Sequence, residues 1–260
     1  MNNFNEKVIL LTGASSGIGY ELAKALDQKG AKLALVARRA NLLNKLNNEL
    51  SGKHLILSGD LSDNIFCKSI VTNTNKHYGR IDIIINNAAI SMNASFADTK
   101  PEVFKKLMDV NYFAPLTISQ NAYPFLKKTQ GSLYFISSVV GKRGFPTRSG
   151  YSASKFAVQG LFESLRSEWQ SDNIHVGIIS PGFTDTNIQN KALDADGEQR
   201  QKRGKTTGRV MSPNKASQLI INAIQNKRRE VILTAAGKLV VQFNKFFPKT
   251  TDKIVTRSIG

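Results

Sequence analysis

Short apolar runs alternate with longer segments of helical periodicity along most of the chain. The runs are strand-sized and nearly continuous, which is typical of strands buried on both faces of a sheet. Residues 81–85, for example, are apolar apart from Asp82. The predicted strands are residues 7–12, 33–37, 54–57, 81–85, 132–137, 174–180 and 231–233.

Apolar residues spaced three or four apart predict the helices between these strands. Pro115 is expected to disturb the longest helix, because proline cannot donate a backbone hydrogen bond. Regular alternation of strand and helix predicts an α/β fold, a single doubly wound domain whose parallel sheet has helices on both faces. The predicted helices are residues 18–28, 42–50, a stretch after Ser62, 101 to about 128, 152–170 and a segment opened by Ser212 and Pro213.

The pattern places one domain over residues 1–234 and an extension over residues 235–260. Within the domain, residues 187–211 are polar, basic and glycine-containing, so we expect a mobile segment rather than a packed element. The extension is basic and amphipathic. Its apolar helical face carries Leu239, Val240, Phe243, Phe246 and Phe247, and its polar face carries Lys238, Gln242, Lys245 and Lys249. We favour internal packing or a subunit contact for the apolar face, with peripheral membrane contact as the alternative.

Composition limits the possible settings of the protein. The 260 residues are 41% hydrophobic, which suits a globular protein, and no apolar run approaches the length of a membrane span. Cys67 is the only cysteine, so an internal disulfide is excluded and a reducing compartment is favoured. The start of the chain lacks the apolar core of a signal peptide, so we expect a cytoplasmic protein. The three histidines lack metal-ligand spacing, so no metal is expected.

The formal net charge of +17 is concentrated near the end of the chain. From residue 201 onward, 13 lysines and arginines face two acids, a net charge of +11. A solvated basic face, a docking surface for an anionic partner and attraction to an anionic membrane all fit this excess. The basic region lacks a recognisable nucleic-acid module, so no nucleic-acid partner is expected.

A glycine-rich turn joins the first predicted strand to the first predicted helix. Its glycines allow a tight turn in which backbone N–H groups approach a pyrophosphate, and the helix dipole adds positive potential. A dinucleotide cofactor is therefore predicted here. The residues expected to contact it are Gly13, Ser15, Ser16, Gly17, Ile18 and Gly19.

Tyr151 and Lys155 stand four residues apart, so a helix places both side chains on one face. A free phenol has a pKa of about 10 and is a poor acid or base at neutral pH. A neighbouring ammonium favours the phenolate and brings this pKa toward the working range. The pair is therefore a candidate proton donor and acceptor.

The ordered motifs of the chain resemble the short-chain dehydrogenase/reductase family. The resemblance implies a Rossmann-type catalytic domain with a seven-stranded parallel sheet, NAD(P)-dependent oxidoreduction and a homodimer or homotetramer. Ala89 is a small departure, because many members carry glycine there. The matching pieces, in order, are Thr12 to Gly19, Asp60-Leu61, Asn86 to Ala89, Asn111, Ser138, Tyr151 with Lys155, and Pro181-Gly182.

The resemblance also implies residue roles. Tyr151 would exchange the proton, Lys155 would lower its pKa and hold the nicotinamide ribose, and Ser138 would orient the substrate carbonyl. Asn111 would position a water that links Lys155 to solvent. The cofactor-contacting residues implied are Asp60 and Leu61 at the adenine, Asn87 and Ala88 at the ribose, and Pro181, Gly182, Thr184 and Thr186 near the nicotinamide, besides Tyr151 and Lys155.

The end of the second strand predicts a preference for NADP(H) over NAD(H). Family members that use NAD carry an acid there that binds the ribose hydroxyls, and this chain has Ala37 instead. Arg38 and Arg39 follow and offer charge-assisted contacts to a 2′-phosphate.

The predicted reaction is reduction of a ketone or aldehyde to an alcohol, or the reverse. Phe145 and Phe183 suggest an apolar wall for the substrate. Two alternatives stay open: a 3-oxoacyl-[acyl-carrier-protein] reductase, whose acidic partner would suit the basic face, and a non-catalytic nucleotide sensor.

Overall fold

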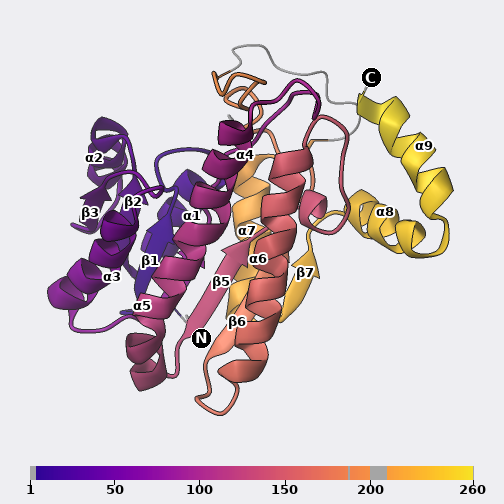
Figure 1. Cartoon of the computed structure of the whole chain (residues 1–260). Coiled ribbons are helices and arrows are strands. Elements are labelled where there is room, and N and C mark those ends of the chain that lie inside the picture. Colours follow the sequence, from indigo (N-terminus) through magenta and orange to yellow (C-terminus); the bar gives the residue numbers. More distant parts are fainter. Residues whose placement is uncertain (1–3, 187, 200–209, 260) are drawn as a thin grey trace.

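The apolar runs form one seven-stranded parallel sheet in the order β3-β2-β1-β4-β5-β6-β7 (Figure 1). The computed structural model describes residues 4–186, 188–199 and 210–259. The sheet confirms the predicted doubly wound α/β fold, and each predicted strand is present within a residue or two. The strands are β1 (Val8–Thr12), β2 (Lys32–Ala37), β3 (Leu55–Ser58), β4 (Ile83–Asn86), β5 (Ser132–Ile136), β6 (His175–Ser180) and β7 (Glu230–Ile232).

Helices cover both faces of the sheet because alternate strand residues point to opposite sides. Ile9 of β1 packs with one group of helices and its neighbour Leu10 packs with the other. One layer contains α1 (Gly17–Asp27), α2 (Ala40–Glu49) and α7 (Pro213–Gln225). The other contains α3 (Asn64–Tyr78), α5 (Ala114–Thr129) and α6 (Ser149–Glu168).

The long helix predicted after Pro101 is interrupted in the middle. Helix α4 (Pro101–Met108) runs into a π-helical turn, Asp109–Phe113, before α5 begins. Pro115 lacks the N–H that would bond to the carbonyl of Asn111 in a continuous α-helix, so a widened turn at this position is the expected response. The turn places Asn111 in the protein interior.

Residues 188–199 correct the expectation that this part of the chain is unpacked. Leu193 is buried, its N–H donates to the Ser91 carbonyl at 2.8 Å, and its carbonyl accepts from the Asn93 N–H at 2.8 Å. Ala192 is also buried. Residues 187 and 200–209 of the predicted mobile segment lie outside the described residues.

The C-terminal extension forms two helices, α8 (Ala235–Phe246) and α9 (Pro248–Ile259), which lie beyond β7 (Figure 1, yellow). The inner face of α8 is formed by Gly237, which approaches Val139 closely. The predicted apolar face points outward instead, with Leu239 70% and Phe246 75% exposed. Internal packing of that face is therefore wrong. Among the described residues, no helix combines the length and apolar character needed to cross a membrane.

Arg143 attaches this helical pair to the rest of the domain. Its Nε donates to Asn244 of α8 at 3.2 Å, and its guanidinium forms an ion pair with Asp252 of α9. The arginine lies in the loop before α6, so one side chain connects the extension to the central fold.

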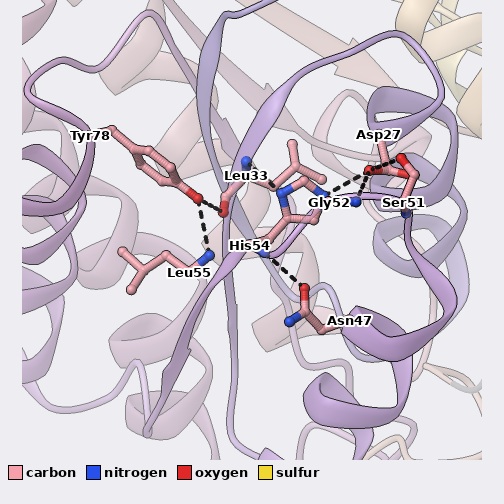
Figure 2. A network of polar contacts seen from close by, with 8 residues as sticks. All are labelled: Asp27, Leu33, Asn47, Ser51, Gly52, His54, Leu55 and Tyr78. Atoms are coloured by element: carbon pink, nitrogen blue, oxygen red, sulfur yellow. Dashed lines mark hydrogen bonds and ion pairs between the residues drawn. The ribbon is translucent and has the colours of Figure 1, made fainter.

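A network of polar contacts closes the amino edge of the sheet (Figure 2). The Asp27 carboxylate at the end of α1 accepts hydrogen bonds from the Ser51 N–H at 3.0 Å and the Gly52 N–H at 3.3 Å. His54 Nε2 lies 2.9 Å from the same carboxylate, and its Nδ1 accepts from the Leu33 N–H at 3.3 Å. Burial opposes ionisation of Asp27, but the hydrogen bonds from Ser51 and His54 outweigh it and lower the carboxyl pKa.

We expect Asp27→Asn to reduce the free energy of unfolding at pH 7 by about 1–3 kcal/mol, because the Asn side chain loses charge-assisted bonds inside this network. Since the folded-state pKa of Asp27 is lowered, its contribution is complete above about pH 4 and is lost as the pH falls through the folded value. Urea unfolding of both proteins between pH 3 and pH 7 measures the effect.

The matched control is Asp196→Asn, which removes an exposed ion pair with Lys100. Such surface pairs contribute about 0–1 kcal/mol. A difference between the wild type and Asp27→Asn that stays constant down to pH 3 would contradict the assigned role.

Candidate active site

The glycine-rich turn lies between β1 and α1, at the carboxyl edge of the sheet. Gly13 and Gly17 have φ angles of +73° and +58°, a region that favours glycine. A Cβ on Gly13 would lie 2.9 Å from the backbone of Ala88, and one on Gly19 would lie 2.2 Å from the Gly13 carbonyl oxygen. The turn therefore accepts no side chain at these positions.

The amino end of α1 has no side-chain cap, although Ser16 occupies the capping position. The first N–H groups of a helix need partners, and the dipole there favours an anion. The Ser15 and Ser16 hydroxyls instead accept hydrogen bonds from Arg39 at 3.2 and 3.3 Å. This arrangement suits a phosphate group, so the residues present fit the dinucleotide expected from the sequence.

Arg38 and Arg39 leave the end of β2 beside this turn. Arg38 lies 3.8 Å from Asp60, and both side chains are about half exposed. Lys191, which sequence analysis missed, joins Arg38 and Arg39 in a group of three cations. Its pKa is lowered by burial and by the nearby charges of Arg39 and Arg38. Lys191 is remote in sequence, so only the fold reveals this group.

Asn87 connects β4 to the glycine-rich turn. Its side-chain amide donates to the Thr12 carbonyl at 2.9 Å, and the Asn87 and Ala88 N–H groups both donate to the Thr12 hydroxyl at 3.0 Å. The predicted ribose-side residues therefore lie against the turn. Leu61 belongs largely to the apolar core, while Asp60 accepts hydrogen bonds from Ser62.

The residues after β6 return to the same edge. The Pro181 carbonyl accepts a hydrogen bond from the Val139 N–H at 3.2 Å, which places this turn beside Ser138. Thr184 is buried, and Thr186 lies so close to the glycine-rich turn that a Cβ on Gly17 would be 3.2 Å from its methyl group. The segment therefore connects the expected nicotinamide side with the expected phosphate side.

Ser138, Tyr151 and Lys155 converge between β5 and α6. Ser138 caps a short 3-10 helix (Val139–Gly141) after β5, and its hydroxyl lies near enough to the Tyr151 phenol to lower the phenol's pKa. Lys155 is 1% exposed; its ammonium donates to the Ile136 carbonyl at 3.1 Å and lies 5.8 Å from the centre of the Tyr151 ring. The structure thus brings the predicted group together.

Burial is the main influence on the pKa values of Tyr151 and Lys155. Burial raises the pKa of Tyr151 to about 12, and the Arg148 charge and the Ser138 hydrogen bond oppose this only in part. Burial also lowers the pKa of Lys155 to about 7. In this arrangement the ammonium bonds to the Ile136 carbonyl and desolvation is the largest influence on both groups, so the lowering of the Tyr151 pKa by Lys155 stays a prediction.

Asn111 supports the group from the π-helical turn. Its side-chain oxygen accepts from the Ile90 N–H at 2.9 Å, and its amide donates to the Ile90 carbonyl at 2.9 Å and to the Ser154 hydroxyl at 3.0 Å. Ser154 precedes Lys155 on α6. Asn111 therefore fixes the lysine-bearing helix to the segment after β4.

Several buried polar atoms at this edge have no hydrogen-bond partner among the described residues. They belong to the ends of neighbouring strands and to the segment before Tyr151. Such groups each cost about 1–3 kcal/mol when left unpaired, so their clustering indicates a place for a polar ligand. They include side-chain atoms of Asn86, Ser137, Ser180, Thr147, Arg148 and Ser149.

Comparison with known proteins agrees with this geometry. The family model described as short chain dehydrogenase matches residues 7–197. The Dehydrogenase/reductase SDR family member 7B of Mus musculus is 36% identical over 87% of this chain and 73% of its own length. The SDR family protein 7-like of Drosophila melanogaster is 36% identical over 90% and 74%.

A solved short-chain dehydrogenase from Streptomyces avermitilis has a similar fold. It is 28% identical, with a TM-score of 0.81 over 97% of this chain and 96% of its own. Family model, relatives and fold agree, so the chain belongs to the short-chain dehydrogenase/reductase family and is an oxidoreductase acting on CH–OH groups.

Proposed function

We propose that the protein reduces a ketone or aldehyde to an alcohol with NADPH. The observation that carries this proposal is the convergence of Ser138, Tyr151 and Lys155 beside the uncapped, glycine-rich amino end of α1. NADPH, when bound, supplies the hydride. The protein must then orient the carbonyl and deliver a proton to its oxygen.

Tyr151 suits the role of proton donor. With its pKa raised to about 12, the phenol stays protonated at neutral pH. An alkoxide is more basic than a phenolate, so the transfer runs downhill as charge develops on the substrate oxygen. The Ser138 hydroxyl stabilises the same oxygen as a fixed donor.

Lys155 and Asn111 would help to replace the proton that Tyr151 donates. Lys155 is buried next to the phenol ring and would hold the ribose hydroxyls at the nicotinamide end. Asn111 would hold a water through which Lys155 exchanges protons with solvent. Phe145 and Phe183, whose ring centres are 6.4 Å apart, would form an apolar wall for the substrate.

Replacing Tyr151 by Phe should lower kcat by roughly 10²–10⁴-fold, because the hydroxyl is the proton donor. The dissociation constant for NADPH should change less than about twofold, because the ring remains. NADPH absorbance with a panel of ketones and aldehydes measures the first quantity, and fluorescence titration measures the second.

Tyr123→Phe is the matched control, since its hydroxyl bonds to Asp172 at 2.5 Å, outside the site. It should keep wild-type turnover. Full carbonyl reduction by the Tyr151→Phe protein would remove Tyr151 from the mechanism.

The preference for NADPH over NADH rests on the three cations beside the glycine-rich turn. Arg38, Arg39 and Lys191 leave a net positive charge there even with Asp60 paired to Arg38. Ala37 offers no carboxylate to bind ribose hydroxyls or repel a phosphate. A 2′-phosphate would therefore gain charge-assisted contacts that NADH lacks.

We expect Arg38→Ala to raise the KM for NADPH about tenfold or more and to leave the KM for NADH nearly unchanged. Arg39→Ala should act in the same direction. Lys45→Ala, an exposed lysine on α2, should change neither value. Better catalytic efficiency of the wild type with NADH than with NADPH would contradict the proposed preference.

A homodimer or homotetramer and a cytoplasmic setting also belong to this proposal. Phe113 and Phe156 are 46% and 45% exposed on the side of the sheet covered by α5 and α6, which favours a subunit contact there. The single Cys67 is buried and free, in agreement with a reducing compartment.

The pair α8 and α9 is proposed to contact an anionic membrane surface. The outer face of α8 carries exposed Leu239 and Phe246, and Lys249 and Lys253 are exposed on α9. The single acid of the pair, Asp252, is already engaged with Arg143. Like charges would oppose each other in a two-fold contact of this surface, whereas anionic lipid headgroups complement them.

Leu239→Ser with Phe246→Ser should reduce sedimentation with vesicles of phosphatidylcholine and phosphatidylserine at least tenfold, because both side chains are exposed and available for insertion. Ile65→Ser with Phe96→Ser, 78% and 71% exposed elsewhere, is the matched control and should bind normally. If the two double variants sediment equally with the vesicles, the membrane proposal is wrong. A dimer that dissociates in the Leu239/Phe246 variant would assign the surface to a second copy instead.

A further inference from the structure

Arg148 is a partly buried cation that no residue of the described chain neutralises. It precedes the first residue of α6, three positions before Tyr151. Within the described part of the chain, its side chain makes one hydrogen bond, from Nη1 to the Ser91 hydroxyl at a long 3.4 Å, and its Nε is buried without a partner. It forms none of the ion pairs found among the described residues.

Arg166, a second arginine on α6, has a structural role and can be compared with Arg148. Arg166, also partly buried, donates from Nε to the Val176 carbonyl at 3.0 Å and from Nη2 to the Arg229 carbonyl at 3.3 Å. Burial lowers the pKa of both arginines. Arg166 is held by backbone acceptors, and Arg148 is not. A buried cation is costly unless an acceptor or an anion meets it, so Arg148 requires another partner.

The residues on either side of Arg148 also have buried polar atoms that lack hydrogen-bond partners among the described residues. The hydroxyls of Thr147 and Ser149 are buried and have no hydrogen-bond partner among the residues that the structure describes. Thr147 also has a φ angle of +60°, which is strained for a β-branched residue, while its carbonyl is held by the Ala94 N–H at 3.0 Å. Strain of this kind persists where function requires it. In the described part of the chain, three consecutive residues therefore present a cation without a counter-ion and two hydroxyls without hydrogen-bond partners.

This group adjoins the proposed catalytic centre. The Arg148 charge acts on the Tyr151 phenol, and the amino end of α6 adds the positive end of a helix dipole with no acid in its first turn. Tyr151 and Ser138 would bind the substrate carbonyl oxygen. Arg148 and the proposed proton donor therefore lie at the same end of α6.

Two cavities flank the segment, and they differ in charge. The one on the Thr147 side, about 340 Å³, is also lined by Asp98, Asp194 and Asp196, which disfavours an anion. The one on the Ser149 side, about 370 Å³, is lined by Phe145 and Pro146 among others, and its Asp252 is paired with Arg143. The second cavity, which Ser149 and Ser152 of α6 also line, is therefore the better match for an anionic compound.

We propose that Arg148, with the hydroxyls of Thr147 and Ser149, forms a subsite for a carboxylate or phosphate group of the carbonyl substrate. A guanidinium binds either group through two parallel hydrogen bonds, and the hydroxyls supply further donors. The substrate is then an anionic oxo compound rather than a neutral ketone. This inference rests on the proposed carbonyl reduction and specifies its substrate class.

The test compares anionic compounds with neutral partners of similar size in the NADPH-loaded enzyme. The pairs are levulinate with methyl levulinate, and hydroxyacetone phosphate with hydroxyacetone. The wild type should show the higher kcat/KM with the anionic member of at least one pair, and that pair tells carboxylate from phosphate. Arg148→Gln should lower kcat/KM for that anion roughly 10- to 100-fold, and less than threefold for its neutral partner.

Two variants on the same helix complete the design. Arg148→Lys keeps the positive charge but lacks the planar guanidinium that binds an anion through two hydrogen bonds. Its KM for the anionic substrate should therefore lie between those of the wild type and Arg148→Gln. Arg166→Gln removes the structural arginine and should not change the ratio between anionic and neutral substrates. An unchanged dissociation constant for NADPH shows that each variant is folded.

Binding without turnover separates this inference from the proposed function. Calorimetry of the favoured anion with the NADP⁺-loaded Tyr151→Phe protein should show binding that Arg148→Gln abolishes. Such binding without reduction of any carbonyl compound by the wild type would overturn the proposed function and leave the subsite standing. Neutral and anionic compounds reduced equally by wild type and Arg148→Gln would overturn the subsite and leave the function standing.

Discussion

Parallel pairing of the strands is the constraint on which the rest of the structure depends. It brings the carboxyl ends of β1, β2, β4, β5 and β6 to one edge, so loops from distant parts of the chain meet there. Register fixes the meeting point: Thr12 pairs with Val36, and Asn86 pairs with Phe135. The bonds between Asn87 and Thr12 then join the loop after β4 to the glycine-rich turn. The site follows from the sheet rather than from any loop alone.

Burial determines the electrostatics of that site. Lys155 lies inside the core, with its ammonium 4.4 Å from the centre of the Phe135 ring and bonded to a backbone carbonyl. Desolvation pushes the phenol and the ammonium toward their neutral forms, so the protein alone keeps Tyr151 protonated. A neighbouring cation lowers the pKa of a buried phenol only where its electrostatic effect exceeds the opposing effect of burial. The spacing of two residues along a helix does not indicate which of the two effects is larger.

Apolar periodicity predicted the strands and the helices, and the ordered motifs that resemble the family predicted the converging residues Ser138, Tyr151 and Lys155. Apolar periodicity is a local property of the sequence, and it was sufficient to predict the strands of the sheet. The packing of Leu193 and the outward face of α8 depend on which surface each segment meets, which periodicity does not specify. Arg148 and Lys191 were missed because a charged residue in a basic sequence looks solvated. The partial burial of Arg148 and the cationic neighbours of Lys191 are set by residues far away in the chain.

Buried polar groups have hydrogen-bond partners at the amino edge of the sheet, whereas several at the carboxyl edge have none among the described residues. We therefore assign the first edge to stability and the second to function. At the amino edge, Asp27 and His54 find partners within the network of Figure 2, so that edge is complete without a ligand. At the carboxyl edge, buried atoms of Asn86, Ser180 and Arg148 have none among the described residues. Folding alone would select against such deficits, because each reduces stability. Their concentration where the strand ends converge therefore indicates that binding, rather than packing, accounts for them.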